Sequence, residues 1–182
     1  MIILGSSRQG RQGEKVAKWV TDYVSKQPGV EVDFADVKDL GLTYFDEAAS
    51  VGYLGGNYKH PKAKAWADRV AKADGFVIVT PEYNHGITAA LKDAIDYVWE
   101  GWHYKPVSFV SYSMAPWGGV RAVEQLRLTM LGVKAFPLYE ATHIGAVHET
   151  VSDLGEIEQE SPNNSLQKTT EELFTVVNML TK

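Results

Sequence analysis

The sequence contains no cysteine, which excludes disulfides, thiolate metal sites and a cysteine nucleophile. It also lacks an apolar run near the roughly 20 residues of a membrane helix, and it begins without the basic and apolar segments of a signal peptide. We therefore expect a cytoplasmic protein with no membrane contact. Basic residues number only 18 against 23 acidic ones, a net charge of −5. This excess of acid argues against nucleic-acid binding, so any bound anion must be held locally.

No low-complexity tract, repeat or long linker divides the chain, and we expect a single domain over residues 1–182. Short apolar runs alternate with segments whose apolar residues recur at helical spacing. The runs predict strands at 2–4, 30–35, 75–80, 106–111 and 134–138. The helical spacing predicts helices near 16–24, 61–73, 87–98, 121–131 and 166–180. Residues 161–165 are predicted to form a turn, and the turn-rich segment 38–58 is assigned to no element.

Strict alternation of strand and helix predicts an α/β fold, a doubly wound parallel sheet with helices on both faces. Five strands fit the order 2-1-3-4-5, for which flavodoxin is a known example with its ligand at the crevice between strands 1 and 3. The two most unusual loops of the chain follow the first and third predicted strands. We therefore expect these loops to meet at one crevice.

The first of these loops, residues 5–13, has the composition of a phosphate site. Glycines allow close backbone approach, serines offer hydroxyl donors, and arginines offer charge-assisted hydrogen bonds at the start of a helix; these are Gly5, Gly10, Gly13, Ser6, Ser7, Arg8 and Arg11. The spacing matches neither a P-loop nor a Rossmann turn, and no nucleophile elbow surrounds the serines. The alternative is a flexible polar loop with two solvated arginines.

Three segments together carry a resemblance to a known family. They are Gly-Ser-Ser-Arg with its glycine-rich helix entry, Pro-Glu-Tyr-Asn-His-Gly at 81–86 running into Leu-Lys-Asp-Ala-Ile-Asp, and the glycine pair before Arg121. The sequence thereby resembles the NAD(P)H-dependent FMN reductases, which include quinone reductases and azoreductase-like enzymes. The resemblance covers about residues 1–138, and the segment 81–96 is its most specific part.

The resemblance implies a set of FMN-binding residues. Ser6, Arg8 and the backbone near Gly13 would hold the phosphate, and Arg11 offers a second guanidinium. The isoalloxazine ring would be lined by Pro81, Glu82, Tyr83, Asn84 and His85, where many relatives have serine in place of His85. The other side of the ring would be closed by the loop 112–119, with Tyr112, Ser113, Trp117, Gly118 and Gly119.

The activity implied is transfer of hydride from NADPH or NADH to FMN and then to quinones, flavins or azo compounds, in a ping-pong two-electron cycle. The flavin does the chemistry, so no catalytic side chain is required. His85 could donate a proton, although a structural role is the favoured reading. Two alternatives remain: an FMN-binding electron carrier or redox sensor without an NAD(P)H site, and an α/β module that binds no flavin.

Two further expectations concern metals and assembly. His143 and His148 are five residues apart, which does not match the spacing of a zinc helix, and we expect no metal. An aromatic group at Trp99, Trp102, His103 and Tyr104 follows the segment 81–96. One reading is that these aromatics simply cap the core. The resemblance implies a homodimer, for which they are also suited, and leaves open whether dimers pair into tetramers.

Overall fold

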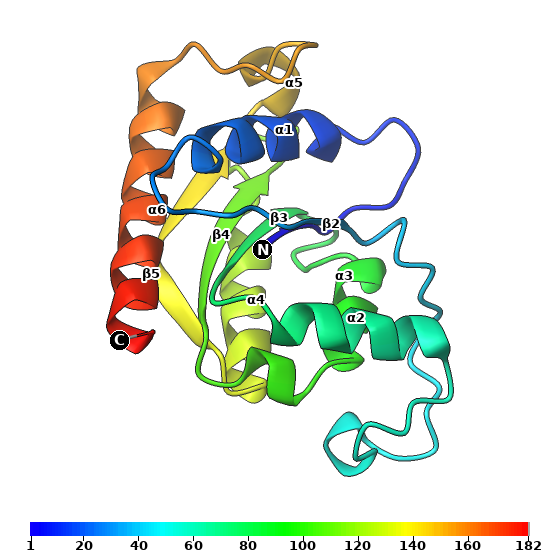
Figure 1. Cartoon of the computed structure of the whole chain (residues 1–182). Coiled ribbons are helices and arrows are strands. Elements are labelled where there is room, and N and C mark those ends of the chain that lie inside the picture. The colour runs from blue at the N-terminus through cyan, green and yellow to red at the C-terminus, as the bar shows by residue number, and fades with distance from the viewer. Residues whose placement is uncertain (182) are drawn as a thin grey trace.

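The computed structural model describes residues 1–181 as one parallel sheet covered by helices (Figure 1). The sheet has five strands in the order β2-β1-β3-β4-β5, and all neighbouring pairs are parallel. The strands are β1 (Ile2–Leu4), β2 (Phe34–Asp36), β3 (Phe76–Pro81), β4 (Pro106–Tyr112) and β5 (Phe136–Ile144). The predicted flavodoxin-like fold class and strand order are confirmed.

Helices cover both faces of the sheet. One face carries α1 (Gly13–Val24) and α6 (Glu160–Leu180), and the other carries α2 (Pro61–Ala71), α3 (Ala89–Asp96) and α4 (Val120–Gly132). A short helix, α5 (Val147–Thr150), follows β5, and single 3-10 turns occur at η1 (Val51–Tyr53) and η2 (Glu100–Trp102). No helix in the described part of the chain combines the length and hydrophobicity needed to cross a bilayer.

Alternate side chains of the central strands enter two separate hydrophobic clusters. Ile3, Ile78 and Phe109 pack against α2, α3 and α4, whereas Ile2 and Val77 pack against α1 and α6. Because both faces are buried, β3 is apolar from Phe76 to Val79, and the polar residues within the central strands are small buried hydroxyls, such as Ser108 of β4. This burial accounts for the continuous apolar runs from which the strands were predicted.

Two strand boundaries differ from the prediction. The second strand was expected at 30–35, but only Phe34–Asp36 pairs, because its sole neighbour β1 begins at Ile2 and offers only three residues. The last strand was expected at 134–138 and extends instead from Phe136 to Ile144. It begins after Lys134, which has a positive φ of 58°, and its far end pairs with the end of β4.

The last helix also differs, because α6 begins at Glu160 and not after a turn at 161–165. Pro162 lies in the first turn of the helix, where backbone N–H groups have no helical partner and proline is tolerated. The side chain of Asn163 bridges to neighbouring elements, since it accepts a hydrogen bond from Trp19 Nε1 at 3.1 Å and donates one to the carbonyl of Ile157 at 2.8 Å. The predicted turn residues are therefore part of the helix.

The core makes a direct prediction about stability. Phe109 lies in the middle of β4 with no exposed surface. Phe109→Ala should lower the free energy of unfolding by about 3–5 kcal/mol through lost burial and an unfilled cavity. Chemical denaturation measures this loss. The matched control is Tyr53→Ala, which removes an aromatic that is 87% exposed and should cost no more than about 0.5 kcal/mol. Equal effects of the two substitutions would contradict the assignment of Phe109 to the core.

Candidate functional site

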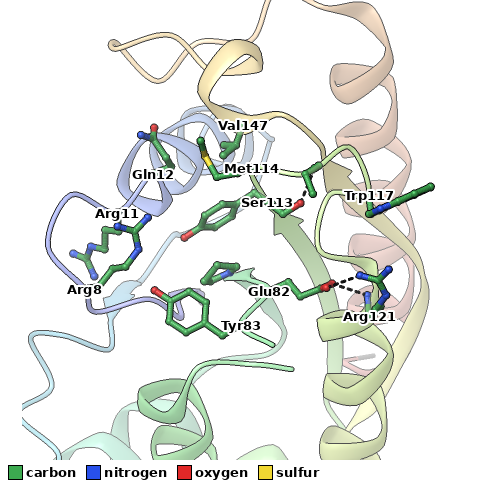
Figure 2. A pocket seen from close by; sticks show the side chains of 13 residues that line it. Arg8, Arg11, Gln12, Glu82, Tyr83, Ser113, Met114, Trp117, Arg121 and Val147 are labelled. Atoms are coloured by element: carbon green, nitrogen blue, oxygen red, sulfur yellow. Dashed lines mark hydrogen bonds and ion pairs between the residues drawn. The ribbon is translucent and has the colours of Figure 1, made fainter. Parts of the chain in front are cut away.

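The loops after β1, β3 and β4 meet at the carboxyl edge of the sheet and enclose a cavity of about 290 Å³ (Figure 2). Residues from these loops and from the starts of α4 and α5 line it: Arg8, Arg11, Gln12, Pro81, Glu82, Tyr83, Tyr112, Ser113, Met114, Ala115, Trp117, Arg121 and Val147. In Figure 2 the arginines of the first loop lie at one side, and Trp117 and Arg121 lie at the opposite side. The loops after the first and third strands, β1 and β3, thus meet at one crevice as expected.

The loop after β1 is anchored at both ends. At its start, Gly5 donates its N–H to the carbonyl of Val79 at 2.8 Å, and its own carbonyl accepts the hydroxyl of Thr88. At its end, α1 begins so close to β4 that a Cβ on Gly13 would lie 2.3 Å from Tyr112 Oη and 2.6 Å from Ser6 Oγ. Gly13 is therefore required by close packing.

Tyr112 and Ser6 form a buried link under this loop. The hydroxyl of Tyr112 donates to Ser6 Oγ at 3.0 Å, and Ser6 has no exposed surface. Burial raises the pKa of Tyr112 to about 12, so the phenol stays protonated at neutral pH. Tyr112 lines the cavity, but Ser6 and Gly13 lie beneath its lining. The two predicted phosphate residues Ser6 and Gly13 thus support the loop from inside.

The two arginines of the loop have different surroundings. Arg8 is exposed, lines the cavity and, within residues 1–181, makes one side-chain hydrogen bond, from Nη1 to the carbonyl of Gln9 at 3.2 Å. Arg11 is buried and bonds to Asp36, Glu14 and the Ser6 carbonyl. Both line the cavity, but Arg8 alone has most of its guanidinium available to a ligand.

The start of α1 also has unpaired polar groups. No side chain caps this helix end among the described residues, and although the N–H groups of Lys15 and Val16 bond to the carbonyl of Gln12, those of Gly13 and Glu14 remain available to an anion. Gln12, the residue before the helix, has a buried Oε1 atom with no hydrogen-bond partner in the described chain. An unpaired buried acceptor is costly, which indicates a missing partner at this position.

The loop after β3 contains a tight turn. Tyr83 and Gly86 exchange two backbone hydrogen bonds of 2.9 Å, and the two residues between them have positive φ, 50° at Asn84 and 67° at His85. Asparagine and histidine are enriched at such positions, so these residue types suit the backbone. Both side chains are exposed and neither lines the cavity. Pro81, Glu82 and Tyr83 of the same segment do line it.

Glu82 caps a helix across the cavity. Its Oε2 accepts the backbone N–H of Arg121 at 3.1 Å, and its Oε1 accepts a hydrogen bond from Arg121 Nη1 at 3.0 Å (dashed in Figure 2). The Glu82 side chain is only 11% exposed. This carboxylate therefore joins the loop after β3 to the first turn of α4.

The loop after β4 is fastened to β5. Ser111 Oγ donates to the carbonyl of Gly118 at 2.6 Å, so the 2.7 Å contact with His143 Nδ1 has the histidine as donor. Burial lowers the pKa of His143, which favours its neutral form. Gly118 and Gly119 have positive φ and do not line the cavity. They shape the loop that presents Met114 and Trp117, which are 57% and 63% exposed.

Some cavity residues were absent from the predicted set, namely Gln12, Met114, Ala115, Arg121 and Val147. The alanine and the methionine lie inside the predicted 112–119 loop. Val147 follows β5, and its N–H is held by the carbonyl of Ser113 at 3.0 Å. The signal that could have found Val147 is positional, since every loop at the carboxyl edge of the sheet approaches the crevice. Among residues 1–181, no three His, Asp or Glu side chains are grouped closely enough to hold a metal.

Known proteins share sequence similarity with this chain. A sequence model described as NADPH-dependent FMN reductase matches residues 1–149. An NAD(P)H-dependent FMN reductase of Schizosaccharomyces pombe is 36% identical over 113 residues, which are 62% of this chain and 56% of the yeast protein. A quinone reductase of Escherichia coli K12 is 28% identical over 84% of this chain and 80% of its own length.

The fold has a counterpart among solved structures. The flavoenzyme NAD(P)H:(acceptor) oxidoreductase FerB of Paracoccus denitrificans superposes with a TM-score of 0.78 at 20% identity, covering 98% of this chain and 96% of its own. At that identity the likeness concerns the fold. The aligned segment spans little more than half of the Schizosaccharomyces pombe protein.

The buried Tyr112 hydroxyl predicts a pH effect on stability. Its pKa is about 12 in the folded protein and near 10 once exposed by unfolding. Above pH 10 the unfolded state alone ionises, so the free energy of unfolding should fall by up to about 1.4 kcal/mol per pH unit until the folded pKa is reached. Tyr112→Phe removes this loss. Denaturation curves of both proteins between pH 10 and 12 measure the difference, and parallel profiles would contradict the buried position of the phenol.

Proposed function

Because the chain belongs to the NADPH-dependent FMN reductase family, we propose that it is an oxidoreductase that uses FMN to pass electrons from NADPH or NADH to small acceptors. The observation that carries the proposal is the composition of the cavity. One end has an exposed cation, Arg8, and an uncapped helix start; the rest includes the apolar surfaces of Pro81, Tyr83, Met114 and Trp117. This arrangement suits a ligand with an anionic tail and a flat aromatic head.

The residues present fit the phosphate of FMN. The first N–H groups of α1 and the guanidinium of Arg8 are donors of the kind that bind phosphate, and both lie beside the cavity. Gln12 Oε1, which has no partner within residues 1–181, would accept a hydrogen bond from a hydroxyl of the ribityl chain. Ser6 and Gly13 would contribute by shaping the loop, because both are buried against Tyr112.

The residues also fit the ring of FMN. Pro81 and Tyr83 supply apolar surface after β3, and Tyr112 to Trp117 supply it after β4. The backbone of the tight turn at 83–86 is held rigidly by its two hydrogen bonds, so its amide groups would keep a fixed orientation toward the ring edge. Asn84 and His85 would act through this backbone.

When bound, FMN would accept hydride from the nicotinamide and deliver two electrons to a quinone, a flavin or an azo compound in a ping-pong cycle. The chain itself would bind the cofactor, orient its ring and exclude water from the ring. Tyr112 stays protonated and Glu82 is committed to α4, so neither is assigned proton transfer. We assign no catalytic side chain, and we assign His85 the conformational role of a left-handed turn residue.

The assembly and location follow from the same premise. We propose a homodimer and a cytoplasmic location, with residues 1–182 acting as one FMN-binding domain. Exposed apolar side chains such as Tyr104, Leu128 and Phe136 are available for a subunit contact. Light scattering of the purified protein tests the dimer and detects any further pairing into tetramers.

The proposed activity is tested by spectra and by kinetics. Flavin absorbance in the purified protein would exclude the alternative that the chain is an α/β binding module without a flavin. Loss of that absorbance on anaerobic addition of NADPH or NADH would separate a reductase from an electron carrier without a nicotinamide site. Parallel lines in double-reciprocal plots with a quinone acceptor are expected for ping-pong turnover, and intersecting lines would contradict it.

Arg8 is expected to contribute most of the side-chain affinity for the phosphate. Arg8→Ala should weaken FMN binding by roughly 10- to 150-fold, the range for a hydrogen bond to a charged group. Titration of the apoprotein with FMN measures this. Lys38→Ala removes the same charge from an exposed residue outside the cavity and is the control. Unchanged affinity in Arg8→Ala would remove Arg8 from the phosphate site.

Gly118 is expected to be required for activity because of its backbone. Its φ is +63°, and a Cβ would lie 2.8 Å from the carbonyl carbon of His143 and 2.9 Å from the N of Ile144. Gly118→Val should therefore displace the loop after β4 and lower steady-state reduction of a quinone. Gly132→Val is the control, since within residues 1–181 a Cβ built there meets nothing within 4 Å beyond its neighbours in the chain and its own helix backbone. Full activity with normal flavin content in Gly118→Val would refute the close packing of Gly118 against His143 and Ile144 as a requirement for activity.

A further inference from the structure

Arg11 lies in the loop proposed to bind phosphate, yet its guanidinium has no donor to spare. Nε and Nη2 both donate to Glu14 Oε1, at 2.9 and 2.8 Å. Nη1 donates to Asp36 Oδ1 at 2.8 Å and to the carbonyl of Ser6, and Nη2 also donates to Asp36 Oδ2. These bonds use all five N–H groups of the side chain. A phosphate could bind Arg11 only by displacing one of these partners.

The charge of Arg11 is also neutralised. Its side chain is 4% exposed and that of Asp36 is 11% exposed, so their bidentate pair is shielded from solvent. The hydrogen bonds with Asp36 raise the pKa of Arg11 further above its ordinary value, and those with Glu14 add to this. One guanidinium with two carboxylates carries a net charge of −1, which offers a dianion no attraction.

The partners of Arg11 show what it does instead. Asp36 is the last residue of β2, and its Oδ1 also accepts the N–H of Lys38 at 3.0 Å. The Ser6 carbonyl belongs to the loop after β1, and Glu14 belongs to the first turn of α1. Arg11 thus joins three elements around the loop. The loop contains Arg8, whose guanidinium is largely unengaged in the described structure.

We infer that Arg11 is a positioning residue: with Asp36 and Glu14 it fixes the loop so that Arg8 and the helix start meet the phosphate, and it does not bind the phosphate itself. The inference rests on the proposed function. The two arginines of the loop thus have different roles. Arg8 binds the phosphate, and Arg11 holds the loop in place through its ion pair with Asp36 at the end of β2.

Asp36→Asn tests the inference by the sign of its effect. If Arg11 only positions the loop, losing the bidentate pair should weaken FMN binding about tenfold, near the lower end for hydrogen bonds to charged groups. If Arg11 binds phosphate, removing its competitor should tighten FMN binding. Riboflavin lacks the phosphate, so its affinity should change less than about twofold, and the ratio of the two dissociation constants isolates the phosphate end.

The matched control is Asp39→Asn. Asp39 is exposed, follows Asp36 by three residues and has no side-chain hydrogen bond or ion pair within residues 1–181. Its replacement removes the same charge near the loop without touching Arg11. Because surface charges act weakly at a distance, the FMN affinity should stay within about twofold of the wild type.

Arg11→Lys provides an independent variant should Asp36→Asn not fold, as judged by circular dichroism and thermal unfolding. Lysine keeps the positive charge but has no planar fork with which to span three acceptors. A positioning role predicts that Arg11→Lys lowers the preference for FMN over riboflavin as much as Arg11→Ala does. Retention of that preference by lysine would overturn the inference.

The outcomes separate this inference from the function beneath it. A wild-type protein that does not bind FMN would refute the proposed function, and the inference would fall with it. A wild type that binds FMN, together with Asp36→Asn that binds it equally or more tightly, would overturn the inference alone. Weaker FMN binding in Asp36→Asn, with unchanged riboflavin binding and a neutral Asp39→Asn, is the supporting result.

Discussion

The site depends on the parallel pairing of β1, β3 and β4. Leu4 pairs with Val79, and Pro81 pairs with Tyr112, so three strands end at nearly the same level. Each strand then releases its loop at the same edge, and the loops have to share one crevice. The hydrogen bond from Gly5 to the carbonyl of Val79 continues the pairing into the first loop. The side chains of separate loops therefore line one cavity because the register of the sheet brings the loops together.

The sequence predicted those parts of the molecule that depend on local pattern. Apolar runs located β3 and β4, because both strands are buried on both faces. The two recognisable loops contribute residues to one cavity, Arg8, Arg11 and Gln12 from the first and Pro81 to Tyr83 from the second. Partners distant in sequence could not be predicted. Arg11 finds Asp36 only because β2 lies beside β1, and Val147 reaches the cavity only because its N–H bonds to Ser113. The residues near Arg11 do not indicate this ion pair, and Val147 could be found only from its position after the last strand, whose end at Ile144 was predicted six residues too early.

Several residues of the recognisable segments have a structural role in the described chain. Asn84 and His85 occupy left-handed positions of a turn, Glu82 caps α4, and Gly13 leaves space for Tyr112. Sequence reasoning treats such residues as potential ligands because their side chains are polar or their position is unusual. In the structure, some residues of these segments line the cavity, and the remaining ones fix the conformation of the loops on which the lining residues lie.

The bond between Tyr112 and Ser6 connects residues that are 106 positions apart in the chain. β1 and β4 lie on either side of β3, so the bond depends on both strand pairings, and contacts of such long range carry a large cost of loop closure. The cavity therefore exists only where all three strands are paired, because its lining comes from the loops that follow each of them. Binding of a flavin at this cavity would then report that the sheet has been assembled, and it would act on a chain whose long-range order is already in place.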